Sequence, residues 1–249
     1  MLYHMYEATR MAIMPWRMGA QAVRNTVMAP WSPLSYTPLG KQIGSAAELF
    51  ERVTRRYGKP EWGLDKTVID GKEVAIEEET VIHRTYCSLV NFKRDTKRND
   101  PKLLVVAPVS GHYATLLRGT VEAMLPDHDV YVTDWNDCRY VPITADRFNL
   151  SDYIDYIIDF LHYLGPNTHV LAVCQPSVPV LAAVSVMSGW GDNCAPASMT
   201  LMGGPIDTRR NPTAVNKLAK EHSIEWFERH VVTVVPPPYP GMGRRVYPG

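Results

Sequence analysis

The chain has 249 residues, enough for one sizeable domain, and 45% of them are hydrophobic, enough to form a buried core. Its 26 Lys and Arg balance its 26 Asp and Glu, so the chain lacks the basic excess of a nucleic-acid-binding protein. The four cysteines are widely spaced without a CxxC pair, which argues against a zinc ribbon or a disulfide framework and predicts reduced thiols in the cytoplasm.

The N-terminal segment does not have the pattern of a signal peptide. Arg10, Pro15 and Arg17 interrupt the region where a continuous apolar block would follow a basic one. No apolar run anywhere reaches the roughly 20 residues that a membrane helix needs. We therefore expect no membrane span.

Residues 1–44 are rich in Met, Trp and Pro and are interpreted as an N-terminal extension. The prolines at its end predict one or two short helices followed by an extended connector. Flexible thioethers and amphipathic indoles suit an adaptable apolar contact surface. The alternative is that they cover one edge of the core, since exposed apolar patches are uncommon.

Residues 45–249 are expected to form an α/β domain. Ser45 and Glu48 predict a capping box at the start of a helix, and Asp70-Gly71 predicts a hairpin between strands 67–69 and 74–76. Residues 80–92 are interpreted as another strand. Further strands are expected at 103–106, 129–133, 169–173 and 197–202, and helices at 113–124, 151–164 (capped by Ser151), 177–187 and 212–230.

This alternation of strands and helices predicts a mostly parallel sheet. Right-handed crossovers place the C-terminal ends of its strands at one edge, where ligands bind in open α/β sheets. The loops 108–112, 134–147, 174–177 and 203–210 are therefore expected to meet there.

Cys174 lies where the strand at 169–173 passes directly into a helix. A strand, one reactive residue and an immediate helix is the arrangement of the nucleophile elbow in α/β-hydrolases. The thiolate is a good acyl nucleophile, and the N-terminus of the next helix would favour its negative charge. Both glycines of G-x-S-x-G are replaced, by Ala172 and Pro176. The alternative is that Cys174 is simply a small buried hydrophobic residue.

An oxyanion hole in this fold takes one N–H from the residue after the nucleophile, here Gln175, and one from the loop after an earlier strand. Ser110 and Gly111 occupy that loop, and His112 is interpreted as a substrate-binding residue beside them. The alternative is that Ser110 and Gly111 only turn the chain and cap the next helix.

A general base is harder to identify. His222 and His230, the only histidines after Cys174, fall within the helix predicted at 212–230, so a structural role is preferred for them. Asp207 follows the strand at 197–202. It is either an acid that orients a base or a turn residue before Asn211.

Several long segments resemble the intracellular polyhydroxyalkanoate depolymerases of bacteria, and the likeness extends over nearly the whole chain. They include PVSGHYATLLRGT (108–120), VTDWNDCR (132–139), DYIDYIIDF (152–160), AVCQPSVPVLAAV (172–184) and SMTLMGGPIDTRRNPTAVN (198–216). The resemblance implies an α/β-hydrolase with Cys174 as nucleophile and without cofactor or metal, which hydrolyses poly(3-hydroxybutyrate) at the surface of cytoplasmic storage granules.

The resemblance also implies that the catalytic Asp and His belong to a C-terminal portion with no counterpart in these residues. We therefore expect the chain to be an N-terminal part of the enzyme, lacking the last strands of the family's sheet and inactive on its own. Two alternatives stay open. One is an acyltransferase like the polyhydroxyalkanoate synthases, whose G-x-C-x-G elbow does not match Ala172 and Pro176. The other is a non-catalytic granule-binding protein.

Overall fold

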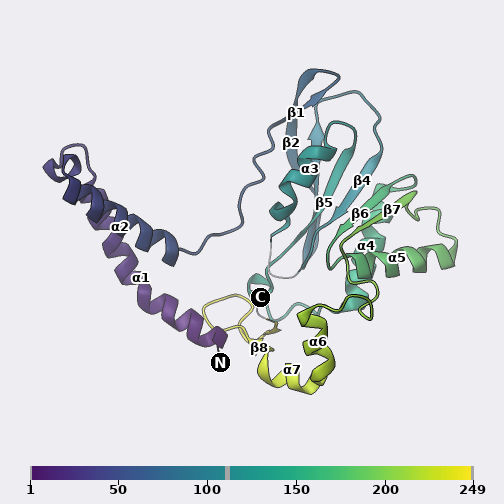
Figure 1. Ribbon diagram of the computed structural model, residues 1–249. Coiled ribbons are helices and arrows are strands. Elements are labelled where there is room, and N and C mark those ends of the chain that lie inside the picture. Colours follow the sequence, from purple (N-terminus) through teal and green to yellow (C-terminus); the bar gives the residue numbers. More distant parts are fainter. Residues whose placement is uncertain (1, 110–112, 248–249) are drawn as a thin grey trace. The chain divides into compact units, whose positions relative to one another are not determined.

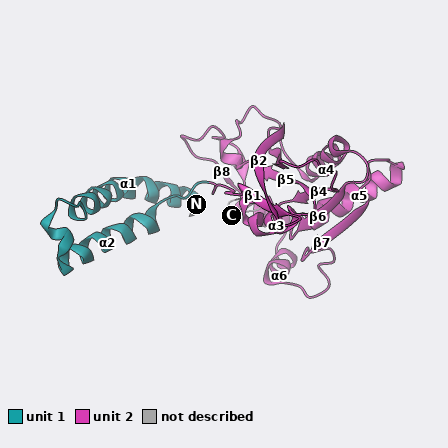
Figure 2. Ribbon diagram, turned by 90° about the horizontal axis from the view of Figure 1, so that it is seen from above, with its two compact units in different colours: residues 1–58 teal, residues 59–249 magenta. Residues whose placement is uncertain are grey.

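The computed structural model describes residues 2–109 and 113–247 and divides the chain into two compact units, Met1–Gly58 and Lys59–Gly249 (Figure 2). The boundary between the units follows Gly58, whereas the predicted extension ends at residue 44. Residue 44 lies inside a helix, because the helix that we expected to begin near Ser45 begins earlier.

The first unit consists of α1 (Leu2–Val27), the short 3-10 helix η1 (Pro33–Tyr36) and α2 (Pro38–Thr54). The expectation of short helices and an extended connector is wrong, since α1 continues through Pro15. The predicted capping box at Ser45 is wrong as well. Thr37 caps α2 by accepting from the N–H of Gly40 at 3.0 Å, and Pro38 occupies the first helical position, where its missing N–H costs nothing.

The second unit contains a seven-stranded sheet of order β1-β2-β3-β5-β4-β6-β7 (Figure 1). The strands are β1 (Lys66–Ile69), β2 (Lys72–His83), β3 (Cys87–Arg94), β4 (Lys102–Val106), β5 (Asp129–Trp135), β6 (His169–Val173) and β7 (Ser198–Met202). The last four are parallel, whereas β1, β2 and β3 are antiparallel to their neighbours. The predicted mostly parallel α/β-hydrolase sheet is confirmed.

The hairpin between β1 and β2 is also confirmed. Asp70 and Gly71 both have positive φ, 51° and 75°, as a two-residue turn of this kind requires. The single strand expected at 80–92 is wrong, because the chain reverses after His83 and returns as β3 from Cys87. A register shift between Thr80 and Ile82 explains the loose alternation there.

Helices cover both faces of the sheet. The 3-10 helix η2 (Ala114–Leu117) and α3 (Arg118–Met124) connect β4 to β5 on one face, and α4 (Leu150–Leu164) and α5 (Ser177–Trp190) lie together on the other (Figure 1). The core between these layers includes Val121, Phe160 and Met187, all with 0% exposure. Asn149, rather than the predicted Ser151, caps α4 in a capping box with Asp152.

The C-terminal part is made of short elements: α6 (Ala214–Glu221), α7 (Ile224–His230), β8 (Thr233–Val234) and β9 (Arg245–Val246). The single helix expected at 212–230 is wrong, because the chain leaves the helical conformation at His222 and α6 begins only after its N-cap Thr213. The 3-10 helix η3 (Cys138–Tyr140) follows β5.

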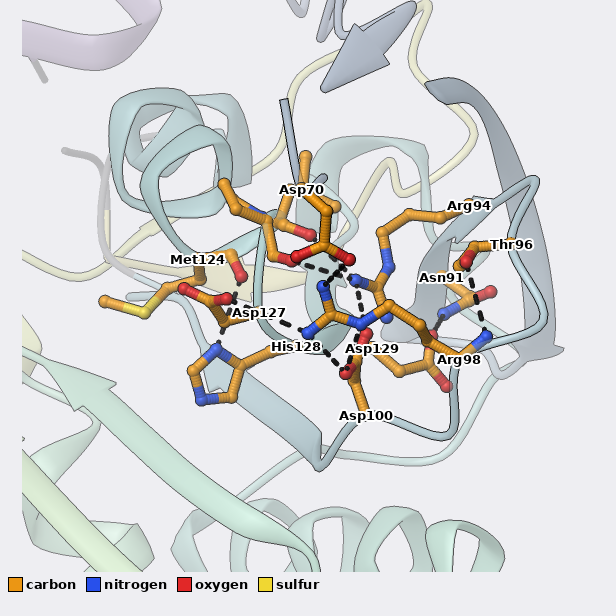
Figure 3. Close-up of polar contacts among 12 residues, drawn as sticks. Asp70, Asn91, Arg94, Thr96, Arg98, Asp100, Met124, Asp127, His128 and Asp129 are labelled. Atoms are coloured by element: carbon orange, nitrogen blue, oxygen red, sulfur yellow. Dashed lines mark hydrogen bonds and ion pairs between the residues drawn. The ribbon is translucent and has the colours of Figure 1, made fainter. Parts of the chain in front are cut away.

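A network of arginines and aspartates lies at the edge of the sheet where β3 ends and β4 and β5 begin (Figure 3). Arg94 has a side chain only 3% exposed, and it pairs with Asp100 at 2.9 Å and donates to the carbonyl of Leu125 at 3.0 Å. Arg98 also pairs with Asp100, at 2.9 Å, but its side chain is 35% exposed. This network is opposite to the edge at which the parallel strands end.

Candidate active site

Cys174 occupies a sharp turn between β6 and α5. Its φ is +69°, a left-handed conformation that non-glycine residues rarely adopt, and its side chain is exposed. Its N–H donates to the carbonyl of Met202 at 2.7 Å, and its own carbonyl accepts from the N–H of Ser177 at 3.1 Å. The strained strand–turn–helix arrangement is that of a nucleophile elbow, which presents the side chain at the sheet edge.

The turn can be this tight because a glycine packs against it. A Cβ atom on Gly204 would lie 2.1 Å from both Cβ and Oγ of Ser177 and 2.7 Å from the carbonyl oxygen of Cys174. Ser177 is fully buried at the start of α5. The loop after β7 therefore packs directly against the turn after β6, and only glycine fits at position 204.

Gln175 joins the turn to the loop after β4. Its Oε1 accepts a hydrogen bond from the backbone N–H of Val109 at 3.1 Å. Its own backbone N–H donates to no described residue. Ser110, Gly111 and His112, the other predicted site residues, lie outside the described residues.

Buried side chains of β5 fix the start of the same loop. The N–H of Ala107 donates to Oγ1 of Thr133 at 2.9 Å, and the carbonyl of Ala107 accepts from Nε1 of Trp135 at 2.9 Å. Thr133 has 0% exposure and Trp135 7%. Sequence reasoning did not select these supporting residues, because a Thr and a Trp in a strand are equally typical of plain core packing.

Arg244 holds the 134–147 loop in place at this sheet edge through hydrogen bonds. Its guanidinium donates to the phenol oxygen of Tyr86 at 2.7 Å and to several carbonyls, among them those of Val141 at 3.2 Å and Ala145 at 3.2 Å. Burial of the phenol raises the pKa of Tyr86, although the nearby charge of Arg244 opposes the shift. A residue near the end of the described chain thus holds a loop about a hundred positions earlier.

The two histidines after Cys174 have partners of their own. His222 stacks on Trp226 with ring centroids 3.9 Å apart, and His230 stacks on the same indole at 4.8 Å. Nδ1 of His230 is also 2.8 Å from the carbonyl oxygen of Trp226. Among the described residues, no histidine or carboxylate side chain is hydrogen-bonded to Cys174.

Asp207 is a turn residue in this structure. It accepts from the backbone N–H of Arg209 at 3.0 Å and pairs with Nε of the same residue at 2.8 Å. The hydrogen bond from the Arg209 side chain lowers the pKa of Asp207. Of the two readings of Asp207, the structure thus shows the contacts of a turn.

A cleft of about 390 Å³ opens beside the elbow, at the end of β7. It begins at Gly203 and Gly204 and continues along the loop to Asn216, the third residue of α6. Ile206 supplies an apolar wall, while Arg210 and Asn211 supply polar groups.

The other cysteines differ from Cys174 in their surroundings. Burial raises the pKa of Cys87 well above its ordinary value and also raises that of Cys138. Cys87 is fully buried, and Cys138 and Cys194 are half-buried. Cys174 is the exposed thiol among the four.

Within the described ranges, no three His, Cys, Asp or Glu side chains lie close enough together to hold a metal ion. The described helices also include none with the length and apolar character needed to cross a membrane.

Comparison with known proteins supports a relationship to polymer depolymerases. Residues 203–249 match the family model described as PHB de-polymerase C-terminus, which links the chain to the PHB depolymerase family. This match includes Gly204, the cleft and Arg244. A search of curated proteins found no match.

Solved structures with a similar fold are esterases and lipases. A putative lipase from Acinetobacter baumannii is 11% identical with a TM-score of 0.43, over 63% of this chain and 54% of that one. Naproxen esterase from Bacillus subtilis is 14% identical with a TM-score of 0.34, over 51% of this chain and 42% of that one. The bacterial brefeldin A esterase is 12% identical with a TM-score of 0.35, over 72% and 47%. The chain spans about half the length of these structures. Because the TM-scores are below 0.5, the fold assignment rests on strand order and elbow geometry.

Proposed function

We propose that this chain, a relative of the PHB depolymerases through residues 203–249, carries the nucleophile of an enzyme that hydrolyses intracellular poly(3-hydroxybutyrate). The relationship supports ester hydrolysis as the reaction class. The observation that carries the proposal is Cys174 itself, an exposed thiol at φ +69° between a buried strand and a helix. A buried structural cysteine needs neither the exposure nor the strain.

The proposed reaction begins with attack of the Cys174 thiolate on a backbone ester carbonyl of the polymer. A carbon–sulfur bond forms, and the negative charge moves to the carbonyl oxygen. The N–H of Gln175 and an N–H of the loop after Val109 stabilise that oxyanion, and each such donor contributes about 3 to 4 kcal/mol in comparable sites. Collapse of the intermediate breaks the carbon–oxygen bond, and the released alkoxide takes a proton to become the shortened polymer's hydroxyl end.

Water then hydrolyses the thioester and releases a 3-hydroxybutyrate unit with a free carboxylate, which regenerates the thiol. Both steps need a general base to accept a proton from the thiol or from water. None of the described histidines is hydrogen-bonded to Cys174. The proposed location is the granule surface in the cytoplasm.

Trapping of the acyl-enzyme tests the nucleophile. The protein is incubated with p-nitrophenyl butyrate and analysed by peptide mass spectrometry, and a butyryl group is expected on Cys174. Cys174→Ala should abolish this adduct, whereas the matched control Cys194→Ala should retain it. Unchanged acylation in Cys174→Ala, or no adduct in the unsubstituted chain, would refute the proposal.

A non-catalytic granule-binding protein is the second candidate. It is favoured by the absence of a base hydrogen-bonded to Cys174 among the described residues. It predicts binding to polymer particles with no acyl adduct on any cysteine. The synthase-like alternative predicts acylation by a 3-hydroxybutyryl coenzyme A thioester in preference to the butyrate ester, so the same trapping experiment with both substrates separates the three.

A further inference from the structure

The two-helix unit Met1–Gly58 buries glutamates and small residues in place of large apolar side chains. Its buried residues are Glu7, Ser32, Gly40, Gly44 and Glu51, and none of its described large hydrophobic side chains is buried. Glutamate is rarely buried in a protein, and a helical hairpin in water normally buries Leu, Ile and Phe instead. The hydrophobic contribution that usually packs two helices in water is therefore weak here, since Ile13 and Val27 are only half-buried.

Polar contacts connect the two helices. Arg24 of α1 pairs with Glu48 of α2 at 3.3 Å, and Arg17 of α1 donates to the carbonyl of Thr54 at 3.5 Å. Gly44 allows close approach, because a Cβ there would lie 2.5 Å from the sulfur of Met28. The helix–helix seam is thus formed by small and charged residues.

The outer side of α2 is an uncharged face on which all residues but Gln42 are apolar. Seven exposed residues share an arc of roughly 120°, as their positions on a helix of 3.6 residues per turn dictate. We call this set the α2 face: Leu39, Gln42, Ile43, Ala46, Leu49, Phe50 and Val53. None is charged, and the exposed fractions of Leu39, Leu49 and Val53 are 62%, 62% and 71%.

Large apolar side chains are also exposed on α1 and in the connection between the helices. Met11, Met14 and Met18 recur at helical spacing on α1 with exposures of 52–60%. Trp16 and Trp31 are 74% and 77% exposed. Their indole N–H groups donate to no described residue.

Resting on the proposed function, we propose that the α2 face of the two-helix unit is the surface by which the protein binds a solid poly(3-hydroxybutyrate) granule. A polyester offers methyl and methylene groups and carbonyl acceptors, but no charge and no hydrogen-bond donor along its chain. The uncharged aliphatic side chains of the α2 face match the methyl and methylene groups. The indole N–H groups of Trp16 and Trp31, which lie outside the α2 face, match the carbonyl acceptors, and indoles favour boundaries between apolar material and water.

The alternative occupant of such a face is a second helix. Leu39, Ile43, Ala46, Phe50 and Val53 follow the four–three spacing of a coiled-coil seam. Coiled coils, however, set their partner by charges at the positions flanking the seam, which here are Gly40, Gln42, Ala47, Leu49 and Thr54. With no charge there and with indoles and thioethers exposed beyond the seam, a broad apolar surface fits better than one partner helix.

Co-sedimentation of the whole chain with protein-free amorphous poly(3-hydroxybutyrate) particles tests the proposal. The variant Leu39→Lys, Leu49→Lys, Val53→Lys should bind at least about tenfold more weakly than the unsubstituted chain. The matched control Val68→Lys, Tyr163→Lys, Trp190→Lys adds the same charge at residues of the second unit that are 54%, 53% and 68% exposed, and it should bind normally. Circular dichroism should show unchanged helix content in the α2 variant, since Lys is a good helix former, and an unchanged spectrum in the control, whose substituted side chains are exposed.

Three results would overturn the proposal. One is equal binding by the two triple variants. Another is light scattering that shows a dimer dissociated by the α2 substitutions while particle binding is unchanged, which identifies a second copy as the occupant. The last is binding that depends on the α2 face with phosphatidylcholine vesicles but not with polymer particles.

The same measurements in a Cys174→Ala background separate this proposal from the proposed function. Binding needs no nucleophile, so Cys174→Ala should sediment with the particles as the unsubstituted chain does. If the α2 substitutions do not weaken particle binding while Cys174 of the unsubstituted chain is acylated, only the docking surface is contradicted. Absence of acylation with the α2 effect intact contradicts only the hydrolase.

Discussion

The backbone N–H of Val109 donates to the side-chain Oε1 of Gln175 at 3.1 Å, across the boundary between two neighbouring parallel strands. This bond connects the loop after β4 to the turn that presents Cys174. The strand order reverses at β4, which lies between β5 and β6, and such a switch point is where ligands bind in open sheets. One side-chain amide thus sets the spacing of the two segments that would hold the oxyanion.

Gln175→Leu should reduce acylation of Cys174 by about tenfold, because a small displacement of an oxyanion donor weakens transition-state stabilisation. It should lower the free energy of unfolding by only about 1 kcal/mol, as for one ordinary hydrogen bond. Gln175→Glu retains an oxygen acceptor and is the control. Stopped-flow release of p-nitrophenol measures the rate, and equal rates in the unsubstituted chain and Gln175→Leu would show that the bond does not position the loop.

Gly204→Ala should destabilise the protein by about 1 to 3 kcal/mol, the usual cost of overpacking a tight site. Its new Cβ would meet Ser177 and the carbonyl of Cys174, so the elbow must shift and acylation should fall as well. Gly189→Ala is the control, since a Cβ there meets nothing within 4 Å and Ala favours the helix. Urea denaturation measures the stability of the two variants. Similar midpoints would contradict the close approach of Gly204 to the turn at Cys174.

Arg94→Ala should cost about 3 to 5 kcal/mol of unfolding free energy, because it leaves the carboxylate of Asp100 buried with less compensation (Figure 3). Arg98→Ala removes a partner of the same carboxylate from a more exposed position and should cost about 1 kcal/mol or less. The comparison is made by urea denaturation at constant ionic strength. Equal losses of unfolding free energy in the two variants would mean that the burial of Arg94 does not increase its contribution to stability.

Thiol labelling should distinguish the cysteines. With iodoacetamide near neutral pH, Cys174 should react first and Cys87 should remain unmodified until the protein unfolds. A raised pKa keeps the Cys87 thiol protonated at pH values where an ordinary thiol begins to ionise, and the thiolate is the reactive form. Peptide mass spectrometry over a time course measures the order, and early labelling of Cys87 would contradict its burial.

The second unit could be predicted from sequence to a large extent. Alternating strands and helices were sufficient for the parallel sheet, and the abrupt strand-to-helix transition was sufficient to locate the turn at Cys174. Errors concentrate where two residues compete for the same role. Asn149 and Ser151 are both good N-caps, and only the packing of α4 on the sheet decides between them.

The first unit was predicted less well, because proline is a strong local signal that the helical context can override. Pro30, Pro33 and Pro38 predicted short helices and an extended connector, yet α2 begins at Pro38, where the missing N–H costs nothing, and extends to Thr54. Gly40 and Gly44 allow α2 to pack closely on its neighbours. In the site, the roles of Gly204 and Arg244 could not be read locally, since both act on segments far away in the sequence.

The left-handed backbone at Cys174 lowers the free energy of unfolding at the position that carries the exposed thiol. Glycine would adopt this φ without strain, and because the Cys174 side chain is exposed, Cys174→Gly should stabilise the fold by up to about 1 kcal/mol in urea denaturation. The same change removes the thiol. A chain optimised only for folding would carry glycine here. Under the proposed function, the strain at Cys174 is the stability cost of placing a nucleophile in this turn.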